Sequence, residues 1–171
     1  MPFIGILSNK KSESEFKKIL IQKTQNSNKK FDIININNKS IDNIRNIKFD
    51  TILIDNTDLS EYEIYLNKIL KSAKYLVINS DINQNFNILK NLETRVITYG
   101  FNPKATITAS SVEDENGLLC IQRNIETSNK NIVEQQEIMV DFSSTNRYID
   151  MGITGISLIY NMEEKRKNEE F

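Results

Sequence analysis

The feature that most constrains the fold of this chain is a series of short apolar runs, rich in β-branched residues, that recur through its first half. Each run is the length of a strand and too short for a helix. Several are apolar without alternation, which is typical of strands buried on both faces of a parallel sheet. The runs are Phe3–Leu7, Phe31–Ile36, Thr51–Asp55, Tyr75–Ile78 and one that begins at Val96.

The segments between these runs carry apolar residues at helical spacing. Ser12 is predicted to cap the first helix, because Glu15 follows three residues later and completes a capping box. Asp58 or Ser60 is predicted to cap a longer helix before the fourth run. Shorter helical segments are expected around Ile41, Ile44 and Ile47, and around Phe86, Ile88 and Leu89. Strands that alternate with helices predict βαβ crossovers and a parallel sheet covered on both sides.

The pattern changes at Asn102-Pro103, beyond which strand-like sequence replaces the helices. Three antiparallel strands are predicted, at Thr106–Glu113, Leu118–Ile125 and Gln136–Phe142. A final helix, capped by Ser143-Ser144-Thr145 and running from about Asn146 to Met162, is apolar nearly all round. Such a helix is buried, either in the core of the domain or in a dimer interface, and its pattern does not separate the two.

The predicted fold is therefore α/β: a three-layer, Rossmann-like, mostly parallel sheet of about five strands with helices on both faces, plus a small three-stranded antiparallel sheet and a buried C-terminal helix. We expect a single domain over residues 1–162. It comprises a parallel α/β part (1–103), an antiparallel ribbon (104–142) and a closing helix (143–162). Residues 163–171 form a charged tail that is expected to be disordered.

Composition excludes several functional classes. The 22 basic and 23 acidic residues give a net charge of −1, so no overall field attracts nucleic acid or an anionic membrane. No apolar run has the roughly 20 residues that a membrane helix needs. The sequence contains no histidine, and its one cysteine, Cys120, lies in a strand pattern that favours a buried thiol over a nucleophile. These observations predict a cytoplasmic protein with neither a nucleic-acid nor a membrane partner.

Several segments, in the same order, resemble the ATP-binding central domain of the Mur ligases, which add amino acids to UDP-muramoyl precursors of peptidoglycan. Arg95-Val-Ile-Thr-Tyr-Gly-Phe-Asn-Pro103, followed by Lys104–Val112, is similar to the segment that closes that domain. Three further segments resemble other motifs of that domain: Arg45–Asn56, Asn79-Ser80-Asp81 and Thr145-Asn146-Arg147-Tyr148. The resemblance implies the α/β fold predicted above and an ancestry among ATP-dependent and magnesium-dependent ligases.

The departures from the family pattern fall on the residues that would carry the chemistry. Gly5-Ile-Leu-Ser-Asn-Lys-Lys-Ser12 lacks the glycines of a phosphate-binding loop, although Lys11-Ser12 is similar to its lysine and hydroxyl residue. Asn35 falls where the resemblance implies a magnesium-binding glutamate, and Thr145 where it implies a histidine. Because phosphoryl transfer depends on metal and loop electrostatics, ligase activity is predicted to be lost, with no cofactor; ATP and Mg²⁺ would bind only if the vestigial site still functions.

Six residues are the candidates for that vestigial nucleotide site: Lys11, Ser12, Asn56, Asn79, Asp81 and Asn146. Asn79 and Asp81 follow the fourth strand, where parallel sheets usually bind ligands, but an Asn-Ser-Asp turn is also ordinary loop chemistry. For Lys11-Ser12 an exposed helix start is favoured over a phosphate contact, and for Asn56 a turn that ends a strand before a helix cap is favoured over a ligand site.

The functional prediction is a non-catalytic Mur-ligase-like binding or scaffolding protein, linked to peptidoglycan precursor synthesis, that forms homo-oligomers or binds a protein partner. The alternative is a module that retains a small-ligand site, for a nucleotide or a UDP-sugar precursor, at the carboxyl ends of the parallel strands. An enzyme with new chemistry is disfavoured, since no histidine is present and no pair of carboxylates converges.

Overall fold

The computed structural model describes residues 1–82, 89–90 and 92–162, without the side chains of residues 61–64. The predicted tail at 163–171 and the helical segment around Phe86 and Ile88 lie outside these residues. The parallel part contains β1 (Phe3–Leu7), α1 (Lys10–Ser27), β2 (Asp32–Asn35), α2 (Ile41–Ile44), β3 (Thr51–Ile54), the 3₁₀ helix η1 (Leu59–Tyr62), α3 (Glu63–Ser72), β4 (Tyr75–Asn79) and β5 (Arg95–Tyr99). There follow β6 (Ile107–Val112), β7 (Asn116–Ile121), β8 (Ile125–Glu126), β9 (Ile132–Val133), β10 (Gln136–Asp141) and α4 (Arg147–Tyr160).

One eight-stranded sheet forms the centre of the molecule, in the order β10-β7-β6-β5-β4-β3-β1-β2. All strands from β2 to β6 in that order are parallel, and β7 and β10 continue the sheet antiparallel. The prediction of a mostly parallel α/β fold is confirmed.

The prediction of a separate three-stranded antiparallel sheet is wrong, because β6 pairs with β5 and joins the ribbon to the parallel strands. A single residue pair, Tyr99 with Ile107, makes this junction. The predicted second strand is also too long: β7 ends at Ile121, and Ile125 begins β8, which pairs with β9 in a small sheet of its own. The ribbon therefore extends the main sheet.

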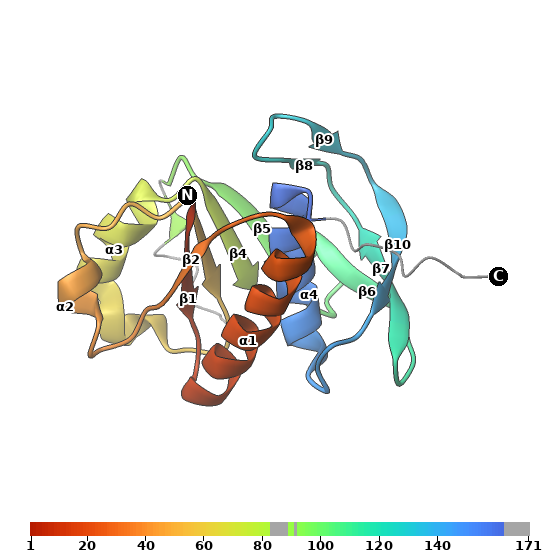
Figure 1. The fold of residues 1–171 in the computed structure, drawn as a ribbon, viewed down its shortest axis with the longest axis horizontal. Helices are drawn as coiled ribbons and strands as arrows, with labels where there is room; N and C mark the ends of the chain where they lie inside the picture. The colour runs from red at the N-terminus through yellow and green to blue at the C-terminus, as the bar shows by residue number, and fades with distance from the viewer. Residues whose placement is uncertain (83–88, 91, 163–171) are drawn as a thin grey trace.

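Helices cover both faces of the parallel strands, as predicted, and each face has its own core (Figure 1). Alternate residues of a strand enter different cores: Ile4 and Ile6 pack under α1 and α4, while Leu7 packs on the side of α2 and α3. The cluster beneath α1 and α4 continues under β6 and β7 through Ile107 and Leu119. The sheet is thus the middle layer of three.

Helix α1 begins at Lys10, so the prediction that Ser12 caps it is wrong. Its N-cap is Asn9, whose Oδ1 accepts a hydrogen bond from the Ser12 N–H at 2.9 Å. Glu15, the other half of the predicted capping box, accepts instead from the Ser144 hydroxyl at 2.5 Å and ties α1 to the segment before α4. Both Asn and Ser are favourable N-caps, and the first apolar residue of the helical pattern, Phe16, lies too far along to distinguish them.

Helix α4 packs in the core of the domain, which answers the question its apolar sequence left open. Its N-cap is Asn146, not the predicted Ser143-Ser144-Thr145, and Asn146 Oδ1 accepts from the Tyr148 N–H at 3.1 Å. Gly152 lies against side chains of the sheet and of α1: a Cβ there would be 3.0 Å from Leu53 Cδ1 and 3.1 Å from Phe16 Cε1. Because Gly152 has no side chain, α4 can approach the sheet closely at this residue.

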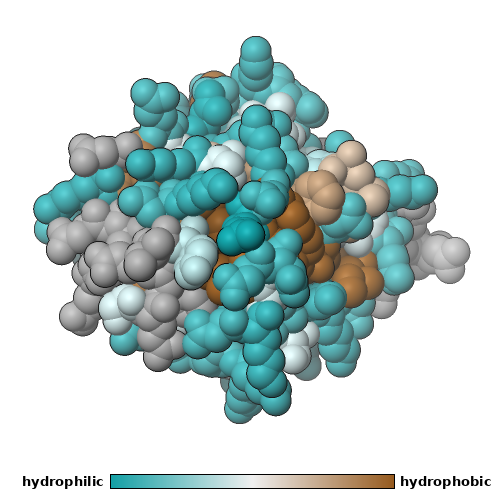
Figure 2. Space-filling model, turned by 90° about the vertical axis from the view of Figure 1, so that its left-hand side faces the viewer, coloured by the Kyte–Doolittle hydropathy of each residue, from teal (hydrophilic) through white to brown (hydrophobic). Residues whose placement is uncertain are grey.

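Figure 2 shows the side of the molecule that carries α2 and α3. It is mostly hydrophilic, with hydrophobic side chains gathered near its middle. Within the described residues, no helix is long and apolar enough to cross a membrane.

Candidate functional site

The carboxyl ends of the parallel strands bring most of the predicted site residues to one edge of the sheet. Asp55 follows β3, Asn79 ends β4, and Asp81 lies two residues beyond it. Helices α1 and α4 both begin at this edge, with Asn9 and Asn146 as their caps. This is the edge at which open parallel sheets usually bind ligands.

A buried hydrogen-bond network lies beneath this edge, centred on Asp55. Its side chain is only 1% exposed, and its Oδ1 accepts from Asn79 Nδ2 and from the Tyr99 hydroxyl, both at 2.8 Å. The Ser8 hydroxyl donates to Oδ2 at 3.5 Å. A buried carboxylate needs such donors, because it has lost those of water. Asn79 therefore holds Asp55 in place and does not point into an open cleft.

The pKa of Tyr99 is raised well above its ordinary value, first because the ring is fully buried and then because the Asp55 carboxylate lies beside its hydroxyl. The hydroxyl consequently keeps its proton at neutral pH and acts as a hydrogen-bond donor. From the sequence, Tyr99 belongs to the Arg95–Pro103 segment, and this role was not predicted for it.

Asp81 organises the loop that follows β5. Its Oδ2 accepts from the Phe101 N–H at 2.6 Å and from the Tyr148 hydroxyl at 3.1 Å. Its Oδ1 accepts from the backbone and side-chain nitrogens of Asn102, at 3.2 and 2.5 Å. A Cβ on Gly100, whose φ is 156°, would lie 2.5 Å from the same carboxylate, so the loop packs directly onto Asp81.

Two opposing effects set the pKa of Asp81. Partial burial raises it, but the hydrogen bonds from Asn102, Phe101 and Tyr148 together outweigh burial and hold the pKa below its ordinary value. Four donors match the roughly four lone-pair sites of a carboxylate. A metal ion could bind Asp81 only by displacing some of them. No cluster of three or more metal-ligating side chains occurs in the described part of the chain.

The phosphate-binding candidates Lys11 and Ser12 do not form a loop. Only Ser8 and Asn9 separate β1 from α1, and both Lys11 and Ser12 lie within the helix. Lys11 is exposed, whereas Ser12 is buried, and its N–H already bonds Asn9. The Ser12 N–H is therefore occupied by the helix cap and is not free to bind a phosphate.

The two remaining candidates, Asn56 and Asn146, lie in a turn and at a helix cap. Asn56 is exposed in the turn after β3, and nearby Asp58 accepts from the Ser60 N–H at 2.9 Å at the start of η1. Asn146 caps α4 two residues before Tyr148, which links it indirectly to Asp81. The position of Asn56 corresponds to the turn alternative that the sequence left open, whereas the capping role of Asn146 was not predicted.

Sequence analysis missed a carboxylate near Asn35. A hydrogen bond joins Glu13, in the first turn of α1, to the Asn35 side chain, while burial raises the pKa of Glu13 and the contact with Asn35 opposes that rise. Asn35 Oδ1 is buried without a hydrogen-bond partner among the described residues. Glu13 could have been found only from the closeness of α1 to β2, which the spacing of the sequence does not give.

An open hollow of about 620 Å³ lies beside Asp81. Lys104 and Arg123 contribute positive charge to it, and the complete lining is Ser80, Asp81, Thr98, Asn102, Lys104 and Arg123. Of the six predicted site residues, Asp81 lines this hollow. The two cations come from the loop after β5 and from the connection between β7 and β8, and neither belonged to the predicted site.

Neither a scan against models of protein families nor a search of curated proteins found a match to this chain.

Proposed function

We propose that this chain is a non-catalytic binding or scaffolding protein on an α/β domain of the kind that the Mur-ligase resemblance implies, and that it performs no phosphoryl transfer. One observation carries the proposal: the connection from β1 to α1 is only two residues long and is closed by its own cap.

A triphosphate is held by several backbone N–H groups that point into one loop, together with a lysine directed at the phosphates. Here the Ser12 N–H is bonded to Asn9, and the Lys11 side chain is on the exposed surface of α1. A connection of two residues, Ser8 and Asn9, is too short to wrap around a phosphate. The nucleotide would lose most of the hydrogen bonds that normally fix it.

The bonding of Asp81 supports the same conclusion. Magnesium that bridges phosphates is normally held by one or two protein carboxylates. The Asp81 carboxylate already accepts four hydrogen bonds, and Asp55 is buried in its own network. Recruiting either one to a metal would break contacts that hold the edge of the sheet together.

An ATP hydrolysis assay with Mg²⁺ tests the proposal. We expect the purified chain to release no more phosphate than a buffer blank, and the Lys11→Ala variant to behave identically. Lys68→Ala removes a lysine from the exposed surface of α3 and serves as the matched control. Hydrolysis that disappears in Lys11→Ala and persists in Lys68→Ala would overturn the proposal.

A second candidate function, small-ligand binding at the carboxyl edge, is favoured by the open hollow beside Asp81. Lys104 and Arg123 would bind an anionic group there, such as the diphosphate of a UDP-sugar precursor. A thermal-shift panel of nucleotides and UDP-muramoyl compounds, repeated with Lys104→Gln and Arg123→Gln, tests this. Stabilisation of the parent chain that both substitutions reduce supports the site, and no shift with any compound rules it out.

Self-association would give the scaffolding role a physical basis. Strand β10 is at the end of the main sheet, and its Met139 is 74% exposed opposite Leu118 of β7. The free edge of such a strand can pair with the same edge of a second copy around a two-fold axis. Light scattering after gel filtration should then give a dimer for the parent chain and a monomer for Met139→Lys. Ile21→Lys, at an exposed apolar position on α1, should remain dimeric.

A parent chain that elutes as a monomer at all concentrations would remove this part of the proposal.

A further inference from the structure

A second cavity, of about 460 Å³, lies at the opposite end of the sheet, where the parallel strands begin. This volume is within the range of small-molecule sites and many times the roughly 30 Å³ that one water occupies. The cavity therefore has room for an organic molecule. It is lined by Pro2, Lys29, Lys30, Phe31, Asp50, Lys74, Tyr75, Arg95, Glu126, Thr127, Ser128, Asn129, Lys130 and Tyr160.

The lining is strongly basic in a protein whose overall charge is −1. Five basic and two acidic side chains surround the cavity, which leaves an excess of three positive charges. Asp50 pairs with Lys74 at 2.7 Å and Glu126 with Arg95 at 2.8 Å, so both acids are already neutralised. Among the described residues, no carboxylate pairs with Lys29 or Lys130.

Helix dipoles oppose this charge but do not cancel it. Helices α1 and α4 end at this side of the sheet, and each C-terminus carries about half a negative charge. Together they offset about one of the three positive charges.

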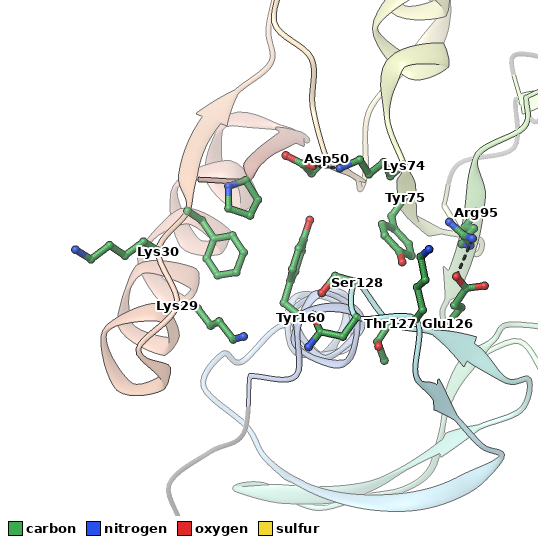
Figure 3. A pocket seen from close by; sticks show the side chains of 14 residues that line it. Lys29, Lys30, Asp50, Lys74, Tyr75, Arg95, Glu126, Thr127, Ser128 and Tyr160 are labelled. Carbon is green, nitrogen blue, oxygen red and sulfur yellow. Dashed lines mark hydrogen bonds and ion pairs between the residues drawn. The ribbon is translucent and has the colours of Figure 1, made fainter.

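The lysine side chains differ in direction. Figure 3 shows Lys30 extending away from the cavity, whereas Lys29 points toward it. The sign of the lining stays positive even when Lys30 is left out.

Tyr75 offers the cavity an unused hydrogen-bond donor. Its ring is buried, but Figure 3 shows its hydroxyl directed into the cavity, and no hydrogen bond joins that hydroxyl to another described residue. Burial raises the pKa of Tyr75, while the nearby Arg95 charge opposes the rise. The hydroxyl therefore keeps its proton at neutral pH. The neighbouring Tyr160 hydroxyl differs, because it is bonded to Thr51 Oγ1 at 2.7 Å.

The turn between β8 and β9 forms the wall of the cavity that faces the sheet, and it is held in place. The Ser128 N–H donates a hydrogen bond to the Ile159 carbonyl of α4 at 2.7 Å, and the Asn131 N–H donates one to Thr127 Oγ1 at 3.2 Å. The exposed side chains of Ser128 and Asn129 line the cavity beside Lys130. A fixed wall of hydroxyl and amide groups suits a ligand with several hydroxyls of its own.

We propose that this basic cavity binds a phosphorylated sugar, either free or as the ribose phosphate of a nucleotide. Lys29, Lys130 and the Tyr75 hydroxyl bind the phosphate, and the β8–β9 turn binds the hydroxyls of the sugar. This goes beyond the function proposed above, because the ligand lies at the end of the sheet opposite Asp81 and Lys104.

Isothermal titration of the full chain with three probes tests the proposal: ribose 5-phosphate, AMP and inorganic phosphate. We expect ribose 5-phosphate and AMP to bind, with affinity that falls as salt rises, and inorganic phosphate to bind at least about tenfold more weakly because it lacks the sugar. AMP binding much tighter than ribose 5-phosphate would identify a nucleotide, and equal binding a free sugar phosphate; both support the site. No binding of either at millimolar concentration, or equal binding of inorganic phosphate, would overturn it.

Substitutions locate the site. Tyr75→Phe keeps the buried ring and removes only the hydroxyl, so we expect at least about tenfold weaker binding without loss of thermal stability. Tyr65→Phe on the exposed side of α3 is the matched control. Lys29→Gln combined with Lys130→Asn should weaken binding to a similar degree; asparagine tolerates the positive φ of 64° at residue 130.

Two results would contradict the assignment. One is unchanged binding in both Tyr75→Phe and the double lysine variant. The other is an equal loss of binding in Lys104→Gln, which would move the ligand to the hollow at the carboxyl edge and leave that second candidate standing.

Discussion

Removing the Tyr99 hydroxyl by Tyr99→Phe should destabilise the fold by a predictable amount. The hydroxyl donates to Asp55 Oδ1 at 2.8 Å, and both residues are at most 1% exposed. The ring remains, so no sizeable cavity forms, and the lost term is one hydrogen bond to a buried carboxylate. Such bonds contribute about 1.5–3 kcal/mol. Asn79 and Ser8 still donate to Asp55, so the carboxylate keeps part of its support.

Equilibrium unfolding in urea at neutral pH measures this change directly. In a chain of this size the expected loss corresponds to a decrease in Tm of about 3–12 °C. Tyr65→Phe removes an exposed hydroxyl and should change the free energy of unfolding by less than about 0.5 kcal/mol.

Alkaline pH gives a second, independent measurement. Because the pKa of Tyr99 is raised in the folded state, the unfolded chain loses this proton first, from a pKa of about 10. The stability that Tyr99 contributes is therefore fully present below about pH 10 and decreases above it. The difference between the parent chain and Tyr99→Phe should shrink over that range. A Tyr99→Phe variant as stable as the Tyr65→Phe control, or a constant difference above pH 10, would refute the reasoning.

Three further predictions concern packing, capping and acid stability. Gly152→Ala should be less stable than Gly155→Ala by about 1 kcal/mol or more in urea unfolding, because both gain helix propensity but the new Cβ at Gly152 is crowded from three sides and that at Gly155 mainly from one. Asn9→Ala should cost about 1 kcal/mol in the same assay, as expected for a lost N-cap, and an unchanged value would argue against its capping role. The lowered pKa of Asp81 means that its contribution to stability is present above its unfolded pKa of about 3.9 and is lost as pH falls through the folded value. Asp81→Asn should therefore show a smaller loss of stability in acid, and an identical acid profile would contradict this role.

The parallel half of the fold was predictable because it depends on local patterns. Phe3–Leu7 and Tyr75–Asn79 are buried on both faces, and such strands are apolar without interruption. The alternation with helices then fixes a parallel sheet. None of this required knowing which distant residues meet.

The joining of the ribbon to the parallel sheet was not predictable in the same way. Turn residues at Asn102-Pro103 indicate a change of direction, but they do not say whether the next strand pairs with β5. The junction depends on one residue pair, Tyr99 with Ile107, and on Thr106, whose N–H donates to Thr98 Oγ1 at 2.9 Å. Contacts of this kind are set by tertiary packing and leave no periodic signal.

The same distinction between local pattern and tertiary packing applies to the residues of the candidate sites. Residues that directly follow a strand, such as Asn79 and Asp81, could be assigned to the carboxyl edge from the sequence. The donors that saturate Asp81 come from Asn102 and Tyr148, far along the chain. The basic cavity gathers Lys29, Tyr75, Lys130 and others from separate connections. Acidic residues elsewhere in the chain balance the positive charge of this cavity, so the net charge of −1 gives no sign of it.

The position of α4 has a consequence for how the chain folds during synthesis. This helix covers β4, β5 and β6 and packs against α1, which lies over β1. The part of this face that α4 covers is therefore buried only when Arg147–Tyr160 has left the ribosome. Until then the nascent polypeptide leaves the apolar side chains of β4, β5 and β6 on that face without the helix that buries them, among them Val77, Ile97 and Ile107. This part of the hydrophobic layer can therefore close only late in synthesis, and apolar surface that is exposed in this way favours aggregation.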